Sequence, residues 1–153
     1  NNGHFLAYSH IAHDCEVGNG VIFSNNGTLA GHVTVADNAI LGGLSAVHQF
    51  CRVGRHAITG GCSKIVQDVP PFMIADGNPA QVRGVNTVGL RRHGFTEEEI
   101  RALKEAHKVI FRRNLTLDEA LAELKALYAG AGPDYPANEL IAFVEGSQRG
   151  IIR

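Results

Sequence analysis

The sequence has 153 residues, of which 44% are hydrophobic and 19% are charged, and its formal net charge is −1. This length suffices for one ordinary hydrophobic core or for two small units. With no block of lysine and arginine, and no apolar run of roughly 18 to 20 residues, we expect no nucleic-acid partner and no membrane span.

A hydrophobic residue recurs at every sixth position from Phe5 to Ile65, and only Thr59 departs from this pattern. A period of six fits neither a helix nor a simple hairpin sheet, but it is typical of a β-helix in which three hexads close one coil. Residues 18 apart then stack at about 4.8 Å. The predicted interior columns are Ile11/Leu29/Val47/Ile65, Val17/Val35/Val53 and Phe23/Leu41/Thr59.

The same count places four histidines on one edge of the predicted solenoid. His10 and His13 lie in the stretch SHIAHDC, and His32 and His48 follow in the next two coils. Gly31 holds the same hexad position as His13, one coil further on. A base and a bare backbone N–H donor are therefore expected to be neighbours.

A metal centre is a different interpretation of these histidines, as in carbonic anhydrases built on a solenoid. Zinc needs three or more converging ligands. His10, His13 and His32 hold different hexad positions, which makes convergence less natural, so we expect no metal site.

Beyond the repeat, Pro70 and Pro71 are expected to end the strand ladder, and residues 71–94 are expected to form a connecting loop after coils that span residues 1–70. Residues 95–153 carry helix signals. Thr96 with Glu99 and Thr116 with Glu119 each form a predicted capping box, and a third helix is expected over residues 137–146.

The three cysteines form no C-x-x-C pair, and Cys15 and Cys51 lie two coils apart by the repeat, too far for a disulfide. Reduced cysteines and the lack of a signal peptide favour the cytoplasm. The chain opens on Asn1 and enters the repeat almost at once, so we expect it to be the back part of a longer protein.

Five stretches together resemble the bacterial UDP-N-acetylglucosamine O-acyltransferases, hexapeptide-repeat enzymes that catalyse the first step of lipid A synthesis. They are HIAHDCEVGNG, GTLAGHVTVADNAILGG, AVHQFCRVG, GGCSKIVQDVPP and GVNTVGLRRHGF. The resemblance implies a left-handed parallel β-helix with a small C-terminal helical domain, and a homotrimer with active sites between subunits. It also implies that several N-terminal coils precede this stretch, and it calls for no cofactor.

The reaction implied by the resemblance moves a 3-hydroxyacyl group from acyl carrier protein to the glucosamine 3-hydroxyl of UDP-N-acetylglucosamine. His13 matches the general base and Gly31 the oxyanion donor, while Asp14 either orients His13 or is a solvated turn residue. The remaining matches are substrate contacts: His10, His32, His48 and Gln49 around the cleft, Gly61 at the acyl chain, and Asn86, Arg92 and His93 at the nucleotide. Because Gly61 has no side chain, we expect a relatively long acyl chain.

Two further interpretations remain open at this point. A UDP-glucosamine N-acyltransferase, or a member of the same fold acting on a 3-amino sugar, would share the fold and the base. Alternatively, the chain by itself is an inert scaffold, because an uncovered coil exposes an unpaired edge.

Overall fold

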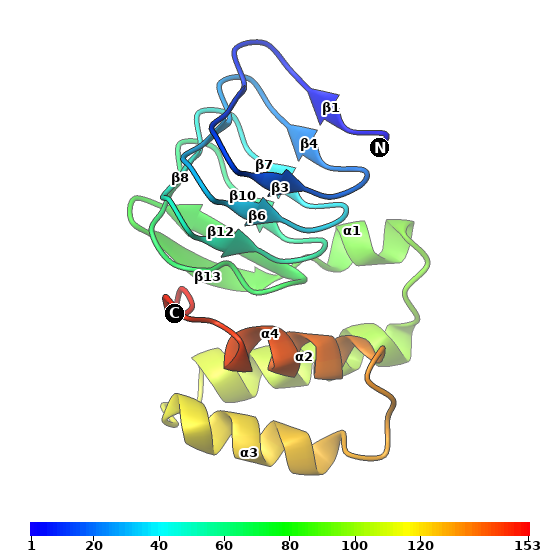
Figure 1. The fold of residues 1–153 in the computed structure, drawn as a ribbon. Coiled ribbons are helices and arrows are strands. Elements are labelled where there is room, and N and C mark those ends of the chain that lie inside the picture. Colours follow the sequence, from blue (N-terminus) through cyan, green and yellow to red (C-terminus); the bar gives the residue numbers. More distant parts are fainter.

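Strands β1 to β11 each hold two residues and follow one another every six residues along the chain. The computed structural model describes all 153 residues (Figure 1). The strands are β1 (His4–Phe5), β2 (His10–Ile11), β3 (Glu16–Val17), β4 (Ile22–Phe23), β5 (Thr28–Leu29), β6 (Thr34–Val35), β7 (Ile40–Leu41), β8 (Ala46–Val47), β9 (Arg52–Val53), β10 (Ile58–Thr59) and β11 (Lys64–Ile65).

Every third strand pairs in parallel, which makes three sheets wound around one axis. The six-stranded sheet has the order β1-β4-β7-β10-β12-β13, the four-stranded sheet β11-β8-β5-β2 and the three-stranded sheet β3-β6-β9. The register joins Ile11 to Leu29, Val17 to Val35 and Phe23 to Leu41. The predicted β-helix and its interior columns are therefore confirmed.

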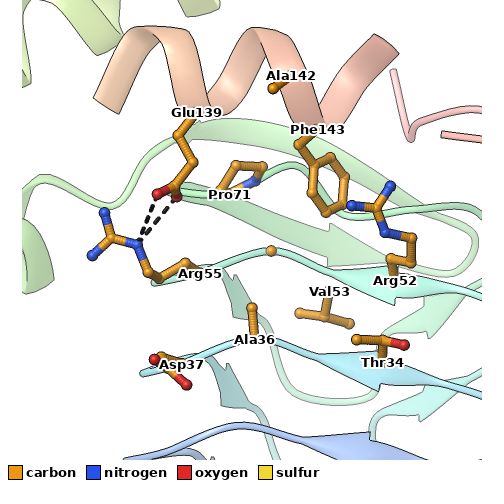
Figure 2. A pocket seen from close by; sticks show the side chains of 11 residues that line it. Thr34, Ala36, Asp37, Arg52, Val53, Arg55, Pro71, Glu139, Ala142 and Phe143 are labelled. Carbon is orange, nitrogen blue, oxygen red and sulfur yellow. Dashed lines mark hydrogen bonds and ion pairs between the residues drawn. The ribbon is translucent and has the colours of Figure 1, made fainter. Parts of the chain in front are cut away.

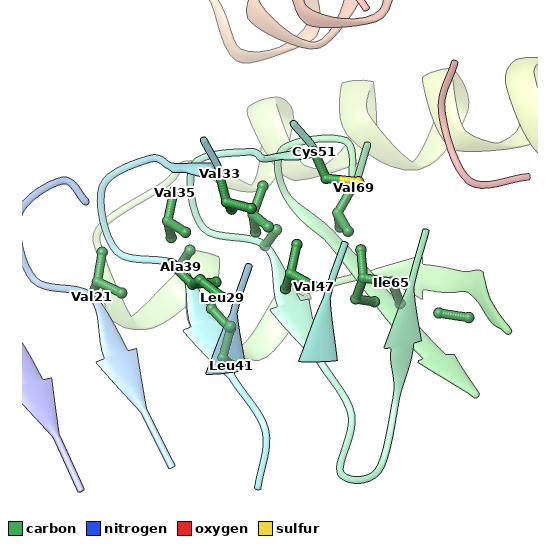
Figure 3. Close-up of a cluster of buried hydrophobic side chains, with 14 of the residues drawn as sticks. Val21, Leu29, Val33, Val35, Ala39, Leu41, Val47, Cys51, Ile65 and Val69 are labelled. Atoms are coloured by element: carbon green, nitrogen blue, oxygen red, sulfur yellow. The ribbon is translucent and has the colours of Figure 1, made fainter. Parts of the chain in front are cut away.

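The interior of the solenoid is a cluster of 16 buried residues, which come from strands of all three sheets, from the corners between them and from the C-terminal segment (Figure 3). Leu29, Leu41 and Ile65 are fully buried. Phe5 and Ile11 hold equivalent positions in the first coil, yet they remain 49% and 41% exposed because no further coil packs above them in this chain.

The corners between strands depend on a left-handed residue. Every sixth residue from Asn2 to Cys62 has a positive φ, and Gly20 is the only glycine among them. Asn26 and Asn38, at 63° and 59°, are residue types that tolerate this region, whereas side chains such as Phe50 at 65° rarely adopt it. Stacking between successive coils must therefore hold these corners in place.

The expectation of a loop over residues 71–94 is wrong. Strand β12 (Met73–Gly77) continues the six-stranded sheet beyond the prolines, β13 (Ala80–Val85) pairs with it in antiparallel fashion, and helix α1 (Thr87–Arg92) follows. Pro70 and Pro71 lie in the corner before β12, where no ladder bond needs their missing N–H.

Three longer helices complete the chain: α2 (Glu97–Phe111), α3 (Leu117–Leu127) and α4 (Pro136–Glu145). Both predicted capping boxes are present, and the side chains of Thr96 and Thr116 accept bonds from the backbone of Glu99 and Glu119. The helices share a second core of 15 buried residues, which includes Phe72 and Met73 of the solenoid end. None of these helices has the length and apolar character needed to cross a membrane.

Polar contacts join α4 and the C-terminal segment to the three-stranded side of the solenoid. Glu139 of α4 accepts bonds from Arg55 Nε at 3.1 Å, and Ser147 donates to Asp68 at 2.6 Å. Ile152 enters the solenoid core. The helical unit therefore packs against the last coils, beneath the solenoid in Figure 1.

Candidate functional site

One edge of the solenoid, where the four-stranded sheet turns into the three-stranded sheet, carries most of the predicted catalytic residues. We call it the histidine edge and define it by three stacked corners: His13–Asp14, Gly31–His32 and Gln49–Phe50. Pairing of β2 with β5 and of β3 with β6 fixes the first corner one rung from the second. His13 therefore stacks on Gly31, and Asp14 stacks on His32.

Asp14 contacts both neighbouring imidazoles. Its Oδ2 lies 2.9 Å from His13 Nδ1 and 3.7 Å from His32 Nε2. The bond from His13, with a smaller effect of the His32 charge, lowers the pKa of Asp14 from its ordinary value. An ionised carboxylate at this distance accepts a hydrogen bond from Nδ1–H, which keeps the ring proton on Nδ1 and leaves the Nε2 lone pair of His13 free.

Gly31 provides the space in which the His13 ring lies. A Cβ atom at this position would come within 2.6 Å of His13 Cε1 and 2.7 Å of Nε2, closer than real Cβ contacts. The Gly31 N–H donates no hydrogen bond within the chain. An unused backbone donor and a free imidazole nitrogen are thus adjacent.

His32 is fixed by aromatic neighbours on both sides. Its ring stacks on Phe50 with centroids 4.7 Å apart and planes at 10°, and it meets the His13 ring edge-on at 5.1 Å. Phe50 was not predicted as a site residue, although it holds the hexad position of His32 one full coil later and the hexad count could have found it. The stacking explains why a 53% exposed phenylalanine occupies this corner.

The other predicted cleft residues are exposed on or near the same edge. His10 is on β2, and His48 and Gln49 precede Phe50, with His48 Nδ1 lying 3.1 Å from the Gln49 carbonyl oxygen. Gly61 lies apart, at the edge between β10 and β11, where a Cβ would meet only the Gly43 oxygen at 3.5 Å.

The predicted nucleotide residues lie elsewhere, around α1. Asn86 is only 5% exposed and caps α1 by accepting from Gly89 N, while its amide donates to the His56 carbonyl. Arg91 pairs with Glu97, but Arg92 is exposed and makes no ion pair. The histidine edge and this segment are not brought together within one chain.

His56 and His93 form a second histidine pair beside α1. Their ring centroids are 4.6 Å apart, and His93 Nδ1 donates to the Gly89 oxygen at 2.9 Å. Burial, followed by the charge of His93, lowers the pKa of His56 from 6.5 to about 4. His56 is only 3% exposed, which fits a structural role.

A cleft of about 490 Å³ opens between the outer face of the three-stranded sheet and α4 (Figure 2). Arg52 lies over the Phe143 ring at 4.2 Å, and Arg55 pairs with Glu139. The cleft holds no histidine, its arginines stay charged at neutral pH, and its two carboxylates are engaged, Asp37 by the Asn19 N–H and Glu139 by Arg55. The cleft therefore offers no free general base, and we do not assign the catalytic site to it.

The residues that could hold a metal ion differ from those considered from the sequence. His13, Asp14 and His32 offer ligand atoms within 4.8 Å of one another. His10 is not among them. All three cysteines are free, and Cys62 is exposed.

Comparisons with known proteins identify the family to which the chain is similar. The family described as Udp N-acetylglucosamine O-acyltransferase, Domain 2, matches residues 68–152, more than half of the chain. An acyl-[acyl-carrier-protein]–UDP-N-acetylglucosamine O-acyltransferase from Burkholderia orbicola is 52% identical over 149 residues, 97% of this chain and 57% of the relative. The chain therefore spans little more than half the length of this curated relative.

Solved structures lead to the same family. LpxA from Acinetobacter baumannii has a TM-score of 0.93 and 42% identity, with 99% of this chain and 58% of that chain covered. UDP-N-acetylglucosamine acyltransferase from Francisella novicida has a TM-score of 0.92 and 37% identity, with 99% and 55% covered. These neighbours are left-handed β-helices, which confirms the expected fold class.

The names of these relatives favour neither an N-acyltransferase nor a carbonic anhydrase. The five stretches that resemble the O-acyltransferases, the solenoid with its helical unit, and both comparisons agree. The chain belongs to the UDP-N-acetylglucosamine O-acyltransferase family.

Proposed function

We propose that this protein transfers a 3-hydroxyacyl group from acyl carrier protein to the glucosamine 3-hydroxyl of UDP-N-acetylglucosamine. The relatives named above are O-acyltransferases that use an acylated carrier protein and this sugar nucleotide. The single observation that carries the proposal is the contact of His13 with both Asp14 and Gly31. It joins an oriented base to a free N–H donor, the two groups that acyl transfer requires.

His13 acts as the general base. A sugar hydroxyl does not ionise at neutral pH, so its proton has to leave as the oxygen attacks the thioester carbonyl. The bond from His13 Nδ1 to Asp14 at 2.9 Å puts the ring proton on Nδ1 and the lone pair on Nε2. The imidazolium that forms is stabilised by the Asp14 carboxylate, and it protonates the departing thiolate of the carrier's prosthetic arm.

Gly31 supplies the donor for the developing oxyanion. Attack on the thioester gives a tetrahedral intermediate with a negative oxygen, and the Gly31 N–H has no partner inside the chain. A preorganised donor of this kind typically lowers the barrier by about 3 to 4 kcal/mol. His32, which lies beside His13, and the exposed side chains of His10, His48 and Gln49 provide polar contacts for the substrates.

The nucleotide is bound by the segment around α1. Arg92 is exposed and free of carboxylate partners, so its guanidinium fork is available for a diphosphate. His93 retains Nε2 for a contact, whereas the buried amide of Asn86 is used for capping and orients α1. Arg92 and His93 lie on a different edge from His13, so one chain does not complete the site.

A homotrimer solves this problem by bringing the histidine edge of one subunit to the α1 segment of the next. The six-stranded sheet supports such packing, because Ile22, Ile40, Ile58 and Ile74 are aligned on its half-exposed outer surface. The corresponding column of the three-stranded sheet is Glu16, Thr34 and Arg52. These polar side chains favour contact with solvent over burial between subunits.

Two further details belong to the proposed function, one for the acyl chain and one for the compartment. Gly61 leaves its corner open, which favours a relatively long acyl chain. Three free cysteines fit a reducing compartment, so we place the reaction in the cytoplasm.

The test is acyl transfer from 3-hydroxyacyl carrier protein to UDP-N-acetylglucosamine by the natural-length protein, with product analysis by mass spectrometry. His13→Ala should lose most of the activity while the oligomeric state and the melting temperature are kept. His107→Ala, a histidine on α2, is the matched control and should remain active. A folded wild type without transfer, or a fully active His13→Ala variant, would contradict the proposal.

A further inference from the structure

We propose that the histidine edge is also a binding site for a transition-metal ion, and that Zn²⁺ held by His13, Asp14 and His32 switches the transferase off. The inhibitory part rests on the proposed function, because it concerns the same base. The metal-binding part does not, since it depends only on the geometry of three side chains.

The corner positions bring these ligands together. Asp14 and His32 occupy equivalent places in successive coils, with φ of 58° and 59°, so their side chains leave the solenoid in the same direction one rung apart. His13 precedes Asp14 and is hydrogen-bonded to it. The ring of His32 is held by its stacking on Phe50, with Nε2 toward Asp14.

The distances suit a small ion. Zinc binds nitrogen and carboxylate oxygen at roughly 2.0 to 2.2 Å, so neighbouring ligands of a tetrahedral site are about 3.4 Å apart. The two separations from Asp14 Oδ2, 2.9 Å to His13 Nδ1 and 3.7 Å to His32 Nε2, lie on either side of this value. All three ligand atoms fall within 4.8 Å of one another, so small rotations of exposed side chains would close the site.

The donor set defines the class of ion. Two imidazoles and one carboxylate favour Zn²⁺ and Co²⁺ over Mg²⁺ and Ca²⁺, which need mainly oxygen ligands. Three protein ligands leave the fourth tetrahedral position to water. The side chains of His13, Asp14 and His32 are 72%, 67% and 43% exposed, so an ion can reach them from solvent.

Metal binding and base catalysis exclude each other at His13. The base needs a proton on Nδ1, donated to Asp14, and a lone pair on Nε2. A metal ion between Nδ1 and Asp14 takes the Nδ1 lone pair, so the neutral ring then carries its only proton on Nε2. The nitrogen that should accept the substrate proton becomes a donor.

Titration of the natural-length protein with Co²⁺, followed by its absorption spectrum, and with Zn²⁺, followed by calorimetry, tests the site. We expect one ion per chain, with affinity at least tenfold weaker in His32→Ala and Asp14→Asn. His48→Ala is the matched control, because His48 lies on the same edge outside the ligand set, and it should bind like the wild type. Equal affinity in His32→Ala and the wild type would overturn the site.

Acyl transfer measured at increasing Zn²⁺ tests the switch. Activity should fall in step with occupancy and return when the ion is removed with EDTA. Full activity with the site saturated would overturn the inhibitory role. If the metal-free protein performs no transfer, the proposed function fails, and the titrations still decide the metal site by themselves.

Discussion

Gly31→Ala tests the contact between base and donor without deleting either group. The added Cβ would lie 2.6 Å from His13 Cε1, and ordinary contact begins at 3.4 Å, so the ring has to retreat by about 0.8 Å. A displacement of about 1 Å at a reacting group costs on the order of 100-fold in rate. We therefore expect kcat/KM to fall about 100-fold, or about 2.7 kcal/mol in the barrier.

The assay is steady-state acyl transfer, together with a urea-unfolding curve for each protein. Gly31 does not have a positive φ, so alanine fits its backbone and the free energy of unfolding should change little. Gly130→Ala is the control, because nothing lies within 4 Å of its added Cβ. If Gly31→Ala keeps the wild-type kcat/KM, the contact of His13 with Gly31 has no part in catalysis.

Three further predictions concern stability. The pKa of His56 falls from 6.5 to about 4 in the native state. Between these pH values the unfolded chain binds a proton that the native protein does not bind. The free energy of unfolding should therefore drop by about 3 kcal/mol as the pH falls from 6.5 to 4. His56→Phe, which retains stacking on Phe72, should flatten that part of the urea-unfolding profile; an unchanged slope would refute the assignment. Thr116→Ala removes the cap of α3 and should cost about 1 kcal/mol by chemical denaturation, whereas Thr28→Ala, outside any helix, should cost less. Leu41→Ala leaves a cavity in the solenoid core and should cost about 3 kcal/mol, and a loss below about 1 kcal/mol would show that the coils collapse around it.

The solenoid is predictable because its signal repeats. One interior position in every hexad specifies the strands, and a step of three hexads specifies which strands pair, so the columns through Leu29 and Leu41 follow from counting. The capping boxes are equally local, because Thr96 and Glu99 bond to each other's backbone within one turn. These features need no knowledge of the rest of the chain.

Features that depend on distant contacts do not follow from the sequence pattern. Pro70 and Pro71 predict the end of the strand ladder. In this solenoid, however, each strand has only two residues, so a proline in a corner interrupts no ladder bond. Strand β12 therefore continues the sheet after the two prolines. The coil also shortens at this point. Ile58 pairs with Ile74, whereas a full coil of three hexads would have led from Ile58 to Asp76. No hexad count predicts that change of step.

The candidate site likewise combines features that the repeat predicts with features that it does not predict. The placement of His13 beside Gly31 followed from the repeat, and its geometry agrees. The contact of Asp14 with His32 did not, because it depends on the left-handed conformation that both residues share. Asn86 is the reverse case, because its match to a nucleotide contact did not predict its structural role. Its side-chain amide donates to the His56 carbonyl and its oxygen caps α1, so it joins α1 to the corner at His56.

The six-residue repeat that packs the core also positions the residues of the candidate site. Interior side chains stack once per coil, and the same step puts His13 on Gly31 and Asp14 on His32. These pairs cannot shift independently of the core, because a slip of the register by a single position would turn Leu29 out of the interior column as it moved Gly31 away from the imidazole. The stability of the coil is therefore what holds base, carboxylate and N–H donor in place, although all but the glycine are exposed to solvent.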